Sequence, residues 1–101
     1  MDVVDKIEII LNTVCYGYEI KPIAIRAKNR QSNIREARQL VAYLVREYTD
    51  LSLPKVGFVI NRDHTTVIHS IKVVRNEIEF NKDYRRKYEL INEIIKSRIY
   101  G

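Results

Sequence analysis

Residues 62–67 bring one basic, one acidic, one imidazole and two hydroxyl side chains together, in the order Arg-Asp-His-Thr-Thr-Val. Three kinds of chemistry use such groups. An Asp–His pair can act as a general base, both side chains can bind a metal ion, and polar side chains at the start of a helix can read the bases of duplex DNA. The rest of the chain decides among these alternatives.

The catalytic and metal-binding alternatives lack supporting residues. No second acidic cluster or nucleophile accompanies the pair Asp63-His64, and the other histidine, His69, lies five residues further on. A metal-binding helix usually spaces its histidines four residues apart, so that both face one side. One cysteine and two histidines also argue against structural zinc. We therefore expect no catalytic residue, no metal and no enzymatic activity.

Length and composition set further limits. The chain has 101 residues and a formal net charge of +5, which suits a single domain over residues 1–101 with little room for a deep catalytic cleft. No GxxxxGK[ST] motif is present, so we expect no nucleotide cofactor. No apolar run is long enough to cross a bilayer, and the single cysteine cannot form an internal disulfide. We expect a cytoplasmic protein with no membrane partner.

The positive charge is concentrated in one part of the chain. Residues 21–46 hold seven basic side chains and one acidic one, whereas residues 1–20 carry a net charge of −3. A local basic block is what a phosphate-binding surface needs, although a solvated charged face is the plainer alternative.

The elements that must position these side chains all have the apolar spacing of helices. Residues Val67, Ile71, Val74 and Ile78, for example, form one stripe. Glycine and proline are scarce, with three and two residues, which disfavours a turn-rich β fold. We predict an all-α domain of about six helices, at residues 2–15, 20–26, 34–48, 53–59, 63–78 and 81–98.

Local signals define the boundaries of the outer helices. Gly17 is predicted to end the first helix. Ser32 or Asn33 is predicted to cap the third, and Glu36 lies three residues after Asn33, as in a capping box.

The middle of the chain has the pattern of a helix-turn-helix. Ser52 is a good N-cap, and Pro54 suits the first turn of a short helix. Asn61 tolerates the left-handed backbone of a tight turn, and Asp63 can cap the longer helix that follows. This order predicts a helical bundle of the Trp-repressor type with a central helix-turn-helix.

The exposed side of the longer helix follows from 100° per residue. Polar side chains fall within roughly 40° of the side opposite Val67, and none of them is acidic. They are Arg62, Thr65, His69, Lys72 and Asn76. At such a tip a threonine offers a methyl and a hydroxyl, and a histidine offers a ring nitrogen, to base edges. The plainer alternative is that Thr65 and Thr66 only cap the helix and that His64 packs.

Residues 37–57, followed by the Arg-Asp-His-Thr-Thr-Val string, resemble the C-terminal DNA-binding domain of the bacterial chromosomal replication initiator DnaA. Ser-Leu-Pro-Lys-Val-Gly at residues 52–57 stands at the matching distance. The resemblance covers nearly the whole chain and is specific over 34–75. It implies a nucleoid-associated domain that binds a short duplex site as a monomeric unit, in DNA replication or its regulation.

The resemblance also implies roles for individual residues. Base contacts are implied for Asp63, His64 and Thr65 in the major groove, for Leu53 and Pro54 at thymine methyls or sugars, and for Arg30 in the minor groove. Phosphate or backbone contacts are implied for Thr66, Arg38, Gln39 and Arg46. Charge and position add Lys28, Arg62 and Lys72 as phosphate contacts.

Two departures from the family matter. The family often has two glycines before the Arg-Asp-His string, whereas this chain has Asn61 alone, so we expect a tighter turn and a slightly rotated helix. The initiator carries a nucleotide-hydrolysing domain ahead of this one, and this sequence shows none, so we expect DNA binding without ATPase activity. A separate replication protein is a further candidate partner.

Two alternatives to duplex DNA binding stay open. A small helical module could dock on a protein through its first or last helix, with tyrosines such as Tyr84, Tyr88 and Tyr100 as its surface, although core and rim positions explain them more simply. RNA binding ranks low because few exposed aromatic side chains are expected for base stacking.

Overall fold

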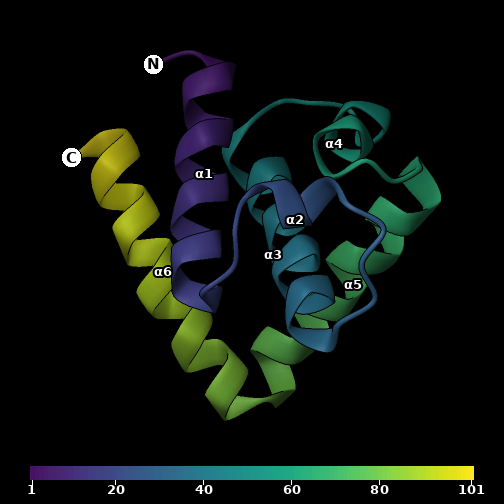
Figure 1. Cartoon of the computed structure of the whole chain (residues 1–101). Helices are drawn as coiled ribbons and strands as arrows, with labels where there is room; N and C mark the ends of the chain where they lie inside the picture. Colours follow the sequence, from purple (N-terminus) through teal and green to yellow (C-terminus); the bar gives the residue numbers. More distant parts are fainter.

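The computed structural model describes all residues, Met1–Gly101, and contains six α-helices and no strand (Figure 1). The helices are α1 (Val3–Tyr18), α2 (Ile23–Arg26), α3 (Ser32–Tyr48), α4 (Leu53–Ile60), α5 (His64–Phe80) and α6 (Lys82–Tyr100). This confirms the prediction of an all-α fold with about six helices.

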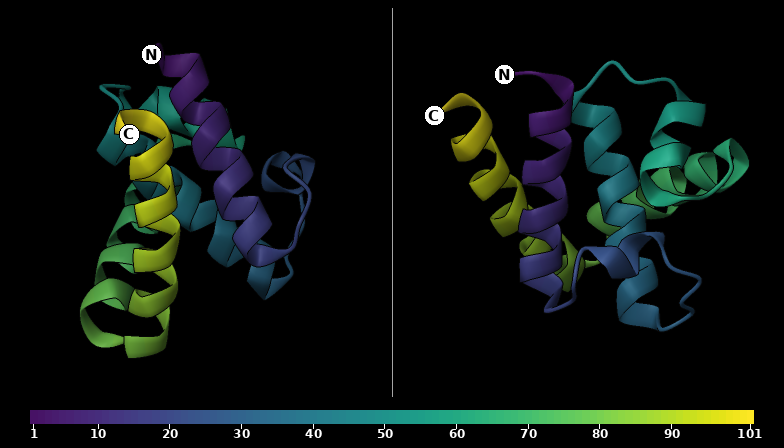
Figure 2. Two further views of the ribbon diagram at one scale, coloured as in Figure 1. Left: turned by 90° about the vertical axis from the view of Figure 1, so that its left-hand side faces the viewer. Right: turned by 45° about the horizontal axis from the view of Figure 1, so that its top comes forward.

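Helix α3 lies at the centre of the arrangement. It contacts α1, α2, α4 and α5, while α6 packs on α1 and on α5 (Figures 1 and 2). Both chain termini lie at the same end of the α1–α6 pair (Figure 2). The helix-turn-helix pair α4–α5 therefore rests on one side of α3, and the α1–α6 pair lies on the other.

The core forms along the faces that the apolar spacing predicted. Val67 and Val74 on α5 are fully buried, as are Val56 and Ile60 on α4. They pack in a single cluster with residues of α3. The α3 members of this cluster are Ala37, Leu40, Val41, Ala42, Leu44 and Val45. Burying each large aliphatic side chain contributes about 1.5–3 kcal/mol, so this cluster fixes the orientation of α5.

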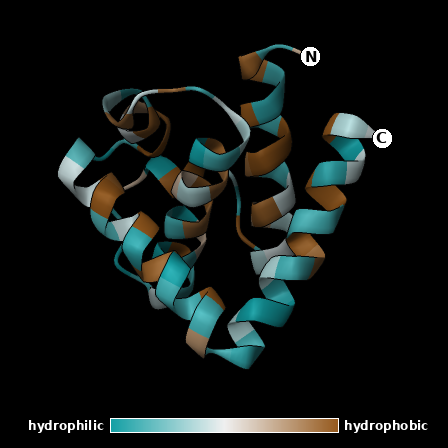
Figure 3. Cartoon of the chain, turned by 180° about the vertical axis from the view of Figure 1, so that it is seen from behind, coloured by the Kyte–Doolittle hydropathy of each residue, from teal (hydrophilic) through white to brown (hydrophobic).

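Hydrophilic and hydrophobic residues alternate along α5 and α6, as amphipathic helices require (Figure 3). No helix combines the length and the apolar character that crossing a membrane requires.

The end of α1 differs from the prediction. Gly17 lies inside the helix, which continues to Tyr18, and the left-handed cap is Glu19 with φ 56°. A Cβ on Gly17 would lie only 3.1 Å from Cδ1 of Ile91. Gly17 therefore allows α6 to pack closely against α1, and the prediction that it ends the helix is wrong.

The predicted capping box at the start of α3 is also wrong. The helix begins at Ser32, and its cap, Gln31, makes no side-chain hydrogen bond. The carboxylate of Glu36 instead accepts a hydrogen bond from the hydroxyl of Tyr18, over 2.7 Å. The side chain of Glu36 therefore binds Tyr18 on α1 instead of the backbone at the start of its own helix.

Candidate nucleic-acid interface

The α4–α5 pair begins and turns at the predicted residues. The hydroxyl of Ser52 accepts the backbone N–H of Lys55, and a proline occupies the first turn of α4. Asn61 ends α4 with φ 57°, in the left-handed region. The Asp63 carboxylate then accepts the backbone N–H of Thr66 over 2.8 Å and caps α5. The predicted cap and turn residues of this pair are confirmed.

Gly57 makes this tight turn possible. The N–H of Arg62 donates to the Gly57 carbonyl over 2.9 Å, which brings the turn against α4. A Cβ on Gly57 would overlap the carbonyl oxygen of Arg62. Any larger residue here must displace the start of α5.

The N-terminal end of α5 is open to solvent. Asp63, His64 and Thr65 are exposed, Thr66 is half-buried, and Lys72 is exposed further along the helix. The opposite stripe is buried and holds Val67, Ser70, Ile71 and Val74. The structure therefore brings the predicted base-reading residues of α5 together on a free surface.

Asp63 has a structural task at this end. Hydrogen bonds from the backbone N–H and then the side chain of Thr66 lower the pKa of its carboxyl group. The charged form caps the helix and also compensates the positive end of the helix dipole.

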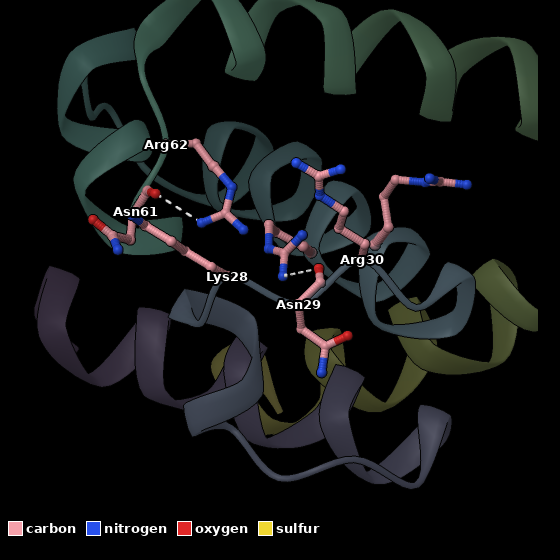
Figure 4. A pocket seen from close by; sticks show the side chains of 7 residues that line it. Lys28, Asn29, Arg30, Asn61 and Arg62 are labelled. Carbon is pink, nitrogen blue, oxygen red and sulfur yellow. Dashed lines mark hydrogen bonds between the residues drawn. The ribbon is translucent and has the colours of Figure 1, made fainter.

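The segment between α2 and α3, residues 27–31, forms a basic arm that carries Lys28 and Arg30. Both side chains are exposed. The arm lies beside the α4–α5 turn, so residues that are about 35 positions apart in sequence share one surface (Figure 4).

Arg38 on α3 holds this arm by hydrogen bonds to its carbonyls. Its side chain is only 6% exposed, and its Nε donates to the carbonyl of Ile25 over 2.7 Å. Nη2 donates to the carbonyls of Ala24, Ala27 and Asn29, which leaves Nη1 as the nitrogen without a protein partner. Burial, and then the charge of Arg62, lowers the pKa of Arg38. Arg38 thus has a structural role that the sequence did not indicate, and a phosphate can reach it only through Nη1.

Two other residues that are predicted to contact phosphate also donate hydrogen bonds to backbone carbonyls of the protein. Arg62 is half-buried and donates to the carbonyls of Ala27, over 2.9 Å, and Asn61, over 2.8 Å. Arg46 is exposed and donates to the Leu51 carbonyl over 2.6 Å, which fixes the connection between α3 and α4.

A cleft of about 570 Å³ lies between the arm, α3 and the α4–α5 turn (Figure 4). Its lining contains five basic side chains, two amides and no carboxylate. The lining residues are Lys28, Asn29, Arg30, Arg35, Arg38, Asn61 and Arg62. The charge pattern makes this a place for an anion.

Sequence reasoning assigned no DNA contact to Arg35, Asn29 or Asn61. The sequence could have indicated a contact for Arg35, because this residue precedes Arg38 by three positions and therefore lies on the same face of the helix. Asn29 gives no signal of its own, since an arm without regular structure has no periodicity, and the sequence marks Asn61 only as a turn residue.

Gln39 lies apart from this cleft. It is half-buried and lines a second hollow with Arg35, which borders both hollows, and with Glu36 and Glu77, whose carboxylates repel phosphate. Leu53 is half-buried and Pro54 exposed, both at the start of α4. The structure therefore groups the arginines of the arm and the turn, and leaves Gln39 outside that group.

The tyrosines do not form one surface. Tyr84 is buried at 8% exposure and Tyr88 is half-buried, while Tyr100 is exposed. Tyr43 and Tyr88 pack edge to face, with ring centroids 6.0 Å apart. The proposed tyrosine docking surface is therefore largely part of the helical bundle.

No three His, Cys, Asp or Glu side chains are grouped so as to hold a metal ion. Burial raises the pKa of the Cys15 thiol to about 11, so this cysteine stays protonated at neutral pH.

Comparison with known proteins gives consistent matches. The family model described as the bacterial DnaA protein helix-turn-helix matches residues 7–74. The chain is 36% identical over 93 residues to the chromosomal replication initiator protein DnaA of Bacteroides thetaiotaomicron. It is 42% identical over 90 residues to that of Caldanaerobacter subterraneus subsp. tengcongensis, and 44% over 73 residues to that of Gloeobacter violaceus.

These matches cover 91%, 89% and 70% of this chain, in the same order. They cover only 20%, 20% and 16% of the relatives. The chain thus spans about a fifth of the length of the curated relatives it matches.

Proposed function

Because this chain belongs to the bacterial DnaA helix-turn-helix family, we propose that it binds specific sequences of double-stranded DNA through the start of α5. One observation carries the proposal: an exposed polar helix tip lies beside a cleft with five basic side chains and no acidic one. A duplex offers both partners at once, since base edges lie in the groove and phosphates flank it.

The major-groove contacts fall to the tip of α5. His64 presents a ring nitrogen to a base edge, and the methyl group of Thr65 suits a thymine. The Asp63 carboxylate uses one oxygen for its cap and has a second that can accept from a cytosine amino group. At the start of α4, Leu53 and Pro54 offer apolar contact to thymine methyls or sugars.

The arm supplies the minor-groove contact. Arg30 is exposed on an arm without regular structure, and arginine is the side chain best suited to a narrow A·T-rich minor groove. Lys28 lies on the same arm and provides charge for the adjacent backbone.

Phosphate contacts surround these two reading elements. The cleft can hold a backbone phosphate between Arg35, Arg62 and the free Nη1 of Arg38. Lys72 on α5 and Arg46 on α3 add positive charge, and the hydroxyl of Thr66 can donate to a phosphate. Gln39 is the least favoured of these contacts because of the carboxylates beside it.

We assign DNA binding to these residues and ATP hydrolysis to none of them. The process that this binding serves is replication initiation or its regulation at the bacterial nucleoid, as the names of the relatives suggest. A separate replication protein is a second partner to test.

The deciding experiment selects duplexes from a randomised library at moderate salt and sequences the bound fraction. We expect one short asymmetric site to be enriched. Recovery of unrelated sequences in proportion to the input would overturn specific binding, and retention of single-stranded RNA in preference to duplex DNA would favour the RNA alternative.

A further inference from the structure

Arg26, the last residue of α2, exchanges two hydrogen bonds with the α4–α5 pair. Its Nη1 donates to the carbonyl of Phe58 over 2.8 Å, and its own carbonyl accepts from Nδ2 of Asn61 over 3.1 Å. The guanidinium also lies over the Phe58 ring, 5.3 Å from the centroid. The two segments are therefore joined in both directions.

Ala27, the first residue of the arm, is joined to the turn in the same way. The carbonyl of Ala27 accepts from Nη2 of Arg62 over 2.9 Å. Two consecutive carbonyls at the start of the arm are thus bound by two consecutive residues of the turn, Asn61 and Arg62. Figure 4 shows Asn61 and Arg62 of this turn together with Lys28, Asn29 and Arg30 of the arm around the cleft.

This connection has an energetic consequence for the arm. The arm belongs to no helix, and a loop that is loose in the free protein must lose conformational entropy when it binds. An arm that is already held at Arg26 and Ala27 loses less. Its direction relative to α5 is also fixed, because the residues that hold it directly precede the Asp63 cap.

Asn61 is suited to this task in a way that glycine is not. Its φ of 57° is in the left-handed region, which both asparagine and glycine tolerate. Only asparagine adds an amide that can reach the Arg26 carbonyl. Asn61 therefore closes the turn and holds the arm with the same side chain.

We propose that Asn61 is a positioning residue that couples the basic arm to the tip of α5, so that Arg30 and His64 engage DNA as one unit. This inference rests on the proposed DNA binding.

The test is a double-mutant cycle with Asn61→Gly and Arg30→Ala on the duplex that the wild-type protein selects. Glycine keeps the positive φ and removes the amide. We expect Asn61→Gly to weaken binding by about three- to tenfold, the value of one hydrogen bond of this kind. We expect Arg30→Ala to cost at least threefold less in the Asn61→Gly background than in the wild type.

One further variant serves as a control, and two others test the coupling again. Asn12→Ala changes an exposed asparagine on α1, a helix that contacts only α3 and α6, and should leave affinity unchanged. Arg26→Lys keeps the charge but loses the guanidinium contact with Phe58. We expect Arg30→Ala to cost less affinity in this background than in the wild type, as in the Asn61→Gly background. His64→Ala combined with Asn61→Gly should also lose less than the sum of the single effects.

Backbone ¹⁵N relaxation of residues 28–30 in the free protein gives a readout that is independent of DNA. We expect larger-amplitude motion in Asn61→Gly at an unchanged melting temperature. Failure of the wild type to enrich any duplex would overturn the proposed function together with this inference. If the wild type does select a duplex, effects of Asn61→Gly and Arg30→Ala that are additive within a factor of two would overturn this inference alone.

Discussion

Arg38 and Arg62 donate to the same carbonyl oxygen, that of Ala27, over 3.2 and 2.9 Å. One guanidinium comes from the core helix α3 and the other from the α4–α5 turn, so the arm is held from two sides. No carboxylate lines the cleft beside them. Two of the five basic side chains of the cleft therefore also maintain the fold.

The first prediction separates Arg38, which supports the arm, from Arg30, for which we propose a DNA contact. Arg38→Met should lower the free energy of unfolding by about 1–3 kcal/mol, because carbonyls at the end of α2 and in the arm lose their donor. Arg30→Ala should leave stability within about 0.5 kcal/mol, because its side chain is exposed. Urea titrations measure both. Equal stability of the two variants would contradict the structural role of Arg38.

His64→Ala tests the reading role of the α5 tip. The side chain is exposed, so we expect no change in melting temperature. Binding to the selected duplex should weaken by about 1–3 kcal/mol, while binding to an unrelated duplex stays the same, because a base contact carries specificity. Fluorescence anisotropy with both duplexes is the measurement. A uniform loss on both sequences would show that His64 reads no base.

Arg46→Ala tests a contact with the DNA backbone. Affinity should fall by a similar factor on every sequence, and the slope of log K against log salt should become smaller by about 1. For a wild-type protein that neutralises six phosphates, that slope is about −5. A salt series with both proteins provides the comparison. A changed sequence preference would argue that Arg46 acts through the Leu51 carbonyl and the start of α4 instead.

Gly57→Ala tests the geometry of the turn. The added methyl group overlaps the Arg62 carbonyl, so the start of α5 must shift or the variant must unfold more easily. We expect a destabilisation of about 1–3 kcal/mol, as for other overpacked sites, together with weaker specific binding. Ser97→Ala, an exposed position on α6, is the matched control. Unchanged binding and stability would mean that the turn yields without cost.

The sequence predicted the α4–α5 pair well because its signals are local. The side chains of Ser52 and Asp63 bind backbone N–H groups three residues later, and the backbone N–H of Asn61 donates to the nearby Phe58 carbonyl, so type and spacing suffice to predict the caps and the turn. Apolar spacing likewise identified the buried face of α5, since helical geometry alone determines it. The exposed polar start of α5 could therefore be predicted without knowledge of any contact between helices.

The features that the sequence did not reveal have the opposite origin. The sequence does not indicate the structural role of Arg38, because its partner at Ile25 lies 13 residues away and no local pattern marks a buried arginine that binds carbonyls. Glu36 was assigned to a cap, but Tyr18, 18 residues earlier, binds it. Gly17 was read as a helix end, although α6 determines its role. In each of these cases a partner far away in the sequence determines the role of the residue.

The last prediction concerns the acid sensitivity of the α5 cap. Hydrogen bonds from Thr66 place the pKa of Asp63 below its ordinary value of 3.8, so the charged form is favoured in the folded state. A group of this kind stabilises the fold above its unfolded pKa, and the contribution disappears as the pH falls through the lower, folded pKa. The wild type should therefore lose melting temperature more steeply below pH 4 than Asp63→Asn, which keeps a capping oxygen but does not titrate. Thermal unfolding at several pH values between 7 and 2 measures the difference. Parallel pH profiles for the two proteins would show that the Thr66 hydrogen bond does not depend on the charge of Asp63. In that case any loss of DNA affinity in Asp63→Asn at pH 7 would report on the proposed base contact alone.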